Sequence, residues 1–208
     1  MTYDGARAYL DTFVNYEHTP KPTAMRQMTL DRMRQLCQRL GDPQRTFRSV
    51  LVGGTNGKGS ICAMLYSMLR QTPLRVGLYV SPHLEDLRER IRVWGPGRPA
   101  GEPTHADDWI EPAAFAALVE RLAPHLDTMR KQGLEESPTY FEAITALAFL
   151  QSVAATSPHS KKSNFLNKKT AQRKLLIIRY SDPHLSPSRA IPRSYRTPVC
   201  QCVLSTTG

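Results

Sequence analysis

The chain has 208 residues, of which 40% are hydrophobic, and a formal net charge of +10. This length can bury one sizeable core, and no apolar run reaches the roughly 18 residues that a membrane helix needs. The N-terminus shows no basic segment followed by an apolar one, so we expect no secretory signal. The four cysteines have neither CxxC nor zinc-ligand spacing. They predict free thiols in a cytoplasmic protein.

The positive charge is concentrated near the C-terminus. Residues 1–150 carry 18 Lys and Arg against 17 Asp and Glu, whereas residues 151–208 carry 10 against one. The basic residues also change in kind, from fifteen Arg and three Lys in the first part to five of each in the second. This shift predicts a boundary near residue 151, and it separates an N-terminal unit (1–150) from a basic tail (151–208).

Hydrophobic periodicity predicts alternating strands and helices in the first part. Apolar residues at helical spacing and short apolar runs mark the elements. The expected helices are 5–16, 30–40, 58–71, 111–133 and 137–151, and the expected strands are 48–53, 75–80 and 91–95. Such alternation indicates an α/β fold with helices flanking a parallel sheet.

The tail shows little order. It is polar and basic, four prolines interrupt residues 181–208, and "LLIIRY" (175–180) is its only strand-like run. Chains of this composition bury too little apolar surface to offset their conformational entropy. We therefore expect a low-complexity tail that forms no compact domain.

The stretch "SVLVGGTNGKGSICAML" (49–65) contains the clearest functional motif. A strand that ends in a glycine-rich turn and opens a helix directs backbone N–H groups and the helix dipole at one point, which favours a phosphate chain. Lys58 would add a positive charge to the phosphates, and Ser60 could place a hydroxyl on Mg²⁺. A turn whose glycines only ease packing is the structural alternative.

The motif departs from the ordinary phosphate-binding loop. Gly59 stands where Ser or Thr would follow the lysine, and Val52 stands where the first glycine is expected. In this form "GTNGKGS" (54–60) resembles the phosphate loop of the Mur-ligase superfamily of ATP-dependent amide ligases. Within that superfamily the sequence is similar to the folylpolyglutamate synthase/dihydrofolate synthase family.

Three further stretches carry the narrower resemblance. "GLYVSPHLEDLRERIRV" (77–93) resembles the family's strand and substrate loop, and "TYFEAITALAFL" (139–150) resembles its helix beside the active site. "LDRMRQLCQRLGDPQ" (30–44) is similar to the helix before the first strand. The resemblance runs from about residue 5 to 150, in the family's order, and it implies the N-terminal part of the Mur-ligase central ATPase domain.

The resemblance implies a ligase that uses ATP and Mg²⁺ and takes folate and glutamate as substrates. ATP would phosphorylate a folate carboxylate, and the glutamate amine would displace phosphate from the acyl phosphate to form an amide. A further implication is a set of residues that cradle ATP: Gly54, Thr55, Asn56, Gly57, Lys58, Gly59 and Ser60. Ser60 and Ser81 would be ligands of Mg²⁺, and Lys58, His83 and Glu142 would be catalytic.

The substrate-binding residues implied by the resemblance lie in the second loop: Pro82, His83, Arg88, Arg90 and, as an alternative arginine, Arg92. Each has a plainer interpretation. Ser81-Pro82 suits an ordinary turn, and the arginines suit a solvated face. Glu142 lies among apolar helix positions, where an unpaired carboxylate is costly, so a structural ion pair is its alternative.

The resemblance stops near residue 150. The family continues with a strand ending in a Glu-Val-Gly-x-Gly-Gly loop whose glutamate ligates the catalytic metal, and then with a second domain. No Glu follows Glu142 here, and no Gly lies between Gly133 and Gly208. We therefore expect a truncated, catalytically incomplete form with a frame-shifted or unrelated tail. The rival interpretation is a shortened protein with a genuine basic module.

Other functions fit less of the sequence. A different Mur-type amide ligase is one alternative, and a nucleotide-binding remnant whose tail binds nucleic acid is another. The tail has few aromatic residues for base stacking, so we do not expect a nucleic-acid partner. We expect a monomer. The sequence leaves open whether dihydropteroate or a reduced folate is the substrate.

Overall fold

The computed structural model describes residues 1–17, 30–53, 56–95, 107–133, 135–156, 175–180 and 201–205. Along the chain the helices are α1 (Tyr3–Asp11), α3 (Asp31–Arg39), α4 (Lys58–Leu69), α5 (Pro112–Arg130) and α6 (Tyr140–Thr156), with short 3₁₀ turns at Pro43–Arg45 and Leu87–Arg90. The strands are β1 (Arg48–Gly53), β2 (Arg75–Tyr79), β3 (Ile91–Trp94), β4 (Leu175–Tyr180) and β5 (Gln201–Ser205). The molecule is therefore an α/β structure.

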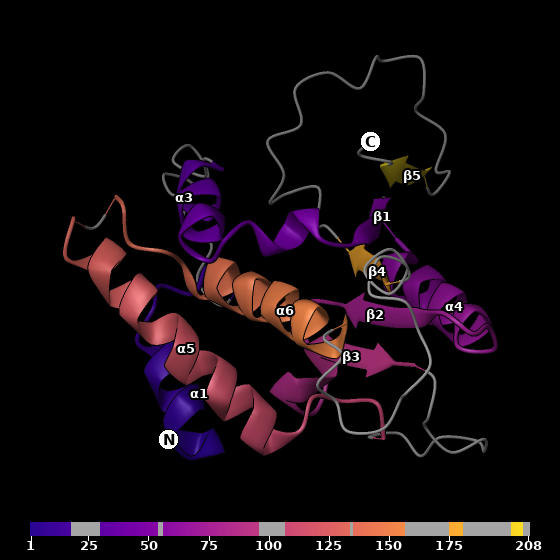
Figure 1. The fold of residues 1–208 in the computed structure, drawn as a ribbon, viewed down its shortest axis with the longest axis horizontal. Coiled ribbons are helices and arrows are strands. Elements are labelled where there is room, and N and C mark those ends of the chain that lie inside the picture. The colour runs from indigo at the N-terminus through magenta and orange to yellow at the C-terminus, as the bar shows by residue number, and fades with distance from the viewer. Residues whose placement is uncertain are drawn as a thin grey trace.

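The sheet is mixed rather than wholly parallel. Its order is β3-β2-β4-β1-β5 (Figure 1). β4 lies parallel to both β1 and β2, whereas β3 and β5 are antiparallel strands at the two edges. β1 and β2 therefore run in the same direction with one strand between them.

Helix α4 covers one face of the sheet. Strand side chains alternate between faces, and Val50, Val52, Val76 and Leu78 point to the α4 side, where they pack with Cys62 and Tyr66. All six residues are at most 7% exposed. This packing holds the N-terminus of α4 just beyond the carboxyl end of β1.

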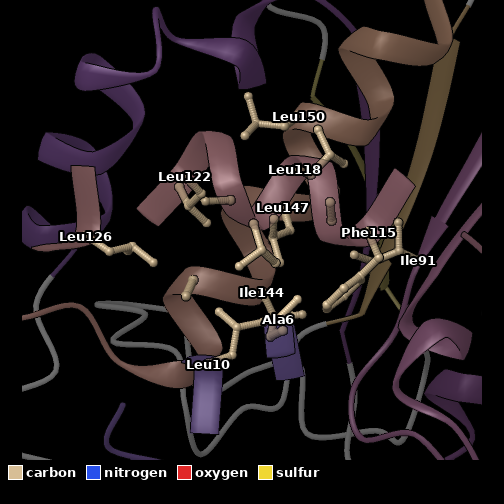
Figure 2. Packing of buried hydrophobic residues seen from close by; sticks show 14 of the residues in the cluster. Ala6, Leu10, Ile91, Phe115, Leu118, Leu122, Leu126, Ile144, Leu147 and Leu150 are labelled. Carbon is tan, nitrogen blue, oxygen red and sulfur yellow. The ribbon is translucent and has the colours of Figure 1, made fainter. Parts of the chain in front are cut away.

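The other side carries the larger core. Helices α1, α5 and α6 converge there, and Figure 2 shows their side chains interleaving. The fully buried members include Leu10 of α1, Phe115 and Leu122 of α5, and Ile144 and Leu147 of α6. Because Ile91 and Tyr79 of the sheet join the same cluster, this core fixes the segment that follows β2 against α1 and α6.

The expected elements of the first part are present, with shifted ends. The helix expected at 5–16 spans Tyr3–Asp11, because the Thr2 side chain caps its N-terminus by accepting from the Gly5 amide at 3.1 Å. Gly41 has φ +79°, as expected of a residue that ends a helix. Pro124 lies inside α5, which continues to Arg130.

Two strands come from the part of the chain expected to show little order. Leu175–Tyr180 is the strand-like run found in the sequence, and it lies in the middle of the sheet. Gln201–Ser205 was expected to be irregular and pairs with β1 at the edge. The sheet therefore gains its central strand from beyond residue 151.

Candidate functional site

The glycine-rich loop joins β1 to α4. β1 ends at Gly53, α4 begins at Lys58, and Gly54 and Thr55 lie outside the described residues. The N-cap residue is Gly57, whose φ of +74° favours a residue without a Cβ. Within the described part of the chain, no side-chain hydrogen bond caps this helix. The first-turn amides of α4 therefore have no side-chain acceptor from the N-cap and suit an anion.

The side chains of this loop differ in exposure. Asn56, Gly59 and Ser60 are exposed, whereas the Lys58 side chain is buried and only 5% exposed. A buried ammonium group favours a nearby anion or polar partner. The loop thus presents an open hydroxyl from Ser60 and an inward-packed cation at the same helix terminus.

The register of the sheet places a second loop at the same edge. Leu51 of β1 and Tyr79 of β2 both align with Arg179 of β4, one on each side. Since β1 and β2 are both parallel to β4, their carboxyl ends meet at one edge, about 10 Å apart by strand spacing. Ser81 therefore emerges beside the glycine-rich loop, the arrangement in which open α/β sheets bind ligands.

The loop after β2 is held by a buried carboxylate. Glu89, 4% exposed, accepts hydrogen bonds from the backbone amides of Leu84, Glu85 and Asp86 at 2.7–2.9 Å. Burial alone would raise the pKa of Glu89, but these amides stabilise its anion and the pKa is lowered. The loop is consequently folded onto its own 3₁₀ turn, with Pro82 exposed at its start.

Ser81, His83 and Arg90 form one network with Glu17. The Ser81 hydroxyl donates to Glu17 Oε1 at 2.5 Å, and Arg90 donates to both carboxylate oxygens of Glu17 at 2.9 and 2.7 Å. Arg90 Nε also donates to His83 Nδ1 at 2.9 Å. Burial, followed by the adjacent Arg90 guanidinium, lowers the pKa of His83. Two predicted site residues, Ser81 and Arg90, therefore meet at the Glu17 carboxylate, and Arg90 links the third, His83, to them.

Arg88 does not join this network. Its guanidinium donates to both oxygens of Asp86 at 3.1 Å and lies over the rings of Tyr3 and Trp109. Arg92 donates to the Glu89 carbonyl at 3.1 Å and also lies over Trp109. Both arginines have structural partners here, and a substrate role for Arg88 stays a prediction without geometric support.

Glu142 caps α6. Its carboxylate accepts from the backbone amide and hydroxyl of Thr139 at 2.7 and 3.0 Å, while the Glu142 amide donates back to Thr139 Oγ1 at 3.2 Å. This reciprocal pair is a capping box. The same oxygen receives a hydrogen bond from Arg32 Nε at 3.2 Å. The observed contacts are those of the structural alternative, and the catalytic role stays a prediction.

A pocket of about 330 Å³ opens beside the network. It is lined by Arg7, Asp11, Asn15, His83, Leu87, Arg90 and Tyr140. Of these, only His83 and Arg90 were candidates from the sequence. Asp11 and Asn15 belong to no recognised sequence motif. Glu17 holds Arg90 in the pocket wall, and it too lies in a polar stretch without a motif. Tyr140 falls within the family-like "TYFEA" stretch, which was the one available signal.

The residues present fit Mg²⁺ only together with phosphate oxygens. Ser60 and Ser81 offer hydroxyl oxygens, which suit this hard cation. The Ser81 hydroxyl donates its proton to Glu17 and accepts a hydrogen bond from Arg90 at 3.3 Å, which leaves one lone pair for a metal. Among the described residues, no group of three or more His, Cys, Asp and Glu is arranged to hold a metal. A nucleotide and water would therefore supply most ligands.

Asp86 provides a test of the loop's electrostatics. Burial would raise the Asp86 pKa, but hydrogen bonds from Arg88 and Tyr3 outweigh it and lower the pKa from 3.8 to about 2. The resulting stability is present above pH 3.8 and is lost as the pH falls towards 2. We expect Asp86→Asn to lower the free energy of unfolding by about 1–2 kcal/mol at neutral pH. In urea titrations this stability difference should shrink below about pH 4. The control is Glu85→Gln, an exposed carboxylate next to Asp86, which should change the free energy of unfolding little. A difference for Asp86→Asn that stays constant with pH would refute the assignment.

Within the described part of the chain, no helix is both long and apolar enough to cross a membrane.

Comparison with known proteins identifies one group of relatives. No protein-family model matches the chain. It is 39% identical over 121 residues to the dihydrofolate synthase/folylpolyglutamate synthase of Bacillus subtilis, covering 58% of this chain and 25% of that protein. It is 40% identical over 116 residues to a probable bifunctional folylpolyglutamate synthase/dihydropteroate synthase of Haloferax volcanii, covering 56% and 12%.

Solved structures give the same result. The folylpolyglutamate synthase of Thermotoga maritima matches with a TM-score of 0.61 and 26% identity, over 85% of this chain and 32% of that one. A complex of folylpolyglutamate synthase (FPGS) with AMPPCP and folate matches with a TM-score of 0.59 and 27% identity. This match covers 86% of this chain and 35% of that one. The chain is thus similar to the N-terminal part of this family and spans a quarter or less of the two curated relatives named above.

Proposed function

We propose that the chain carries the nucleotide-binding and substrate-loop part of an ATP-dependent ligase that joins glutamate to a folate. The observation that carries the proposal is that the glycine-rich connection from β1 to α4 and the segment Ser81–Arg90 after β2 lie at one edge of the sheet. Similarity to folylpolyglutamate synthases supplies the substrates. The position of the glycine-rich loop before α4 supports a P-loop-type site.

The proposed reaction has two steps. The γ-phosphoryl group of ATP passes to a carboxylate oxygen of the folate, giving ADP and an acyl phosphate. The glutamate nitrogen then attacks the carbonyl carbon, the bond to the phosphate oxygen breaks, and an amide forms with loss of phosphate and a proton. Such chemistry depends chiefly on positioning and on neutralising charge at the phosphoryl group.

In this proposal the chain's own residues bind and orient the phosphates. The first-turn amides of α4 would hold phosphate oxygens, and Lys58 would supply positive charge at the same terminus. Ser60 and Ser81 would hold Mg²⁺, which when bound supplies further charge neutralisation. Folding of residues 83–90 onto Glu17 and Glu89 keeps Ser81 and the pocket wall fixed.

We further infer that the sequence resemblance to the family ends near residue 150, although the solved structures match over 85–86% of the chain. We infer too that residues 151–208 are of separate origin, as a frame-shifted tail would be. The support is compositional: the net charge and the choice of Lys over Arg change there. The match to the Bacillus subtilis protein, 121 residues or 58% of this chain, is consistent with it. β4 would then be a strand from the tail that occupies a central place in the sheet.

Nucleotide binding provides the direct test. We expect Lys58→Ala to weaken ATP binding about 10- to 150-fold, the equivalent of about 1.5–3 kcal/mol for a hydrogen bond to a charged group. The control is Lys131→Ala, an exposed lysine at the C-terminal cap of α5, which should leave the affinity unchanged. Both variants are titrated with ATP by calorimetry. Equal affinities for the two variants would show that phosphate does not bind at this loop.

A further inference from the structure

Arg90 is buried and uses its guanidinium entirely within the protein. It is 1% exposed. Nε donates to His83 Nδ1 at 2.9 Å, and Nη2 donates to Glu17 Oε2 at 2.7 Å. Nη1 donates to Glu17 Oε1 at 2.9 Å and to the Ser81 hydroxyl oxygen at 3.3 Å. This two-point pairing with Glu17 sets the plane of the guanidinium group. Its remaining edge is therefore directed at His83.

The Nε contact determines where His83 carries its proton. A guanidinium group has only donors and stays charged in proteins. Nδ1 must consequently accept with its lone pair, which leaves the single proton of the neutral imidazole on Nε2. Among the described residues Nε2 has no hydrogen-bond partner, and His83 lines the pocket.

We propose that Glu17 and Arg90 fix His83 as the Nε2–H tautomer, so that the ring donates a hydrogen bond to a ligand in the pocket. Arg90 is then a positioning residue and not a receptor for a substrate carboxylate, the role that the sequence predicted. Glu17 acts through Arg90. This tautomer belongs to the unliganded chain and does not depend on the proposed ligase reaction.

The chemistry of the pocket indicates the group that His83 would meet. Arg7 and Asp11 line the same pocket and offset each other in charge, and Arg90 is already paired. The proton on Nε2 needs an atom with a lone pair. The pocket therefore suits an uncharged acceptor, a carbonyl oxygen or an aromatic ring nitrogen, on a ligand of modest size.

The tautomer can be measured directly in the full 208-residue chain labelled with ¹⁵N. At about pH 8, above the usual histidine pKa, we expect an imine-type shift at Nδ1 and a pyrrole-type shift at Nε2, with a coupling across the hydrogen bond from Arg90 Nε. His83→Gln identifies the signal among the six histidines. A protonated Nδ1, or two averaged shifts, would overturn the proposal.

Two further arms test the cause and the ligand. In Glu17→Gln/Arg90→Met, which removes both buried charges together, the His83 shifts should move towards averaged values while those of His125 on α5 stay constant; unmoved His83 shifts would contradict a positioning role. If this variant fails to fold, the coupling in the unmodified chain decides.

The second experiment adds folic acid to the unmodified chain and rests on the proposed function. We expect the chemical shift of the His83 Nε2 proton to change. An unchanged shift would contradict the ligand assignment and would leave the tautomer assignment intact.

Discussion

The 208-residue chain, assayed alone with ATP, folate and glutamate, is expected to form no glutamylated folate at a measurable rate. Ser60 and Ser81 offer neutral hydroxyls to Mg²⁺, and β4, whose sequence is "LLIIRY", contributes no carboxylate at the site edge. A metal that must neutralise a transferring phosphoryl group loses much of its effect without a charged ligand. The chain also corresponds to only 25% of the Bacillus subtilis relative.

The measurement is phosphate release from ATP together with mass detection of the product. We expect the rate to lie several orders of magnitude below about 1 s⁻¹, the lower end of ordinary enzyme rates. Turnover near that value with both substrates present would show that residues 151–208 complete the site.

A chimera distinguishes two reasons for an inactive chain: a catalytic site that is incomplete, or a ligase function that is wrongly proposed. Residues 1–150 are joined to the corresponding remainder of the Bacillus subtilis enzyme, and the product is again detected by mass. We expect the chimera to glutamylate folate and its Lys58→Ala form to lose that activity, with Lys131→Ala as the matched control. A folded chimera that binds ATP but makes no product would argue against the ligase proposal.

The sequence predicted the local elements and missed the network that orders the site. β1 and β2 are short apolar runs, and β1 leads into a glycine-rich turn, which local patterns reveal. "LEDLRER" contains two arginines two residues apart, and nothing local shows that Arg90 turns inward to Glu17 while Arg88 pairs with Asp86. Glu17 is 73 residues away from Arg90 in sequence. Such pairing is decided by tertiary packing of α1 and the loop.

Two other differences have identifiable causes. The Thr139-x-x-Glu142 spacing is itself the pattern of a capping box, so the structural role of Glu142 was readable from the sequence. The central place of β4 was not readable, because a strand's neighbours depend on long-range pairing and not on its own composition. The apolar run at 175–180 therefore indicated a strand but not its place between β2 and β1 in the sheet.

The buried pair of Glu17 and Arg90 gives the largest expected effect on stability. Arg90 is 1% exposed and the Glu17 side chain 13%. Removing one member of such a pair leaves an uncompensated charge, so we expect Glu17→Ala to lower the free energy of unfolding by about 3–5 kcal/mol. Glu17→Gln keeps an acceptor for Arg90 and should cost less. The control, Arg34→Ala, breaks an exposed pair with Asp31 and should change stability by at most about 1 kcal/mol.

Urea unfolding of these variants measures how much the Glu17–Arg90 ion pair contributes to the free energy of unfolding. The transition midpoints are compared at a common slope, and the Glu17→Met/Arg90→Met double variant removes both charges together. Since replacing both buried charges by apolar side chains is often nearly neutral, the double variant should be more stable than Glu17→Ala. A Glu17→Ala chain that unfolds at the same urea concentration as the unmodified chain would mean that residues 12–17 do not hold the loop. Ser81 and His83 would then lack the fixed positions on which the proposed site depends.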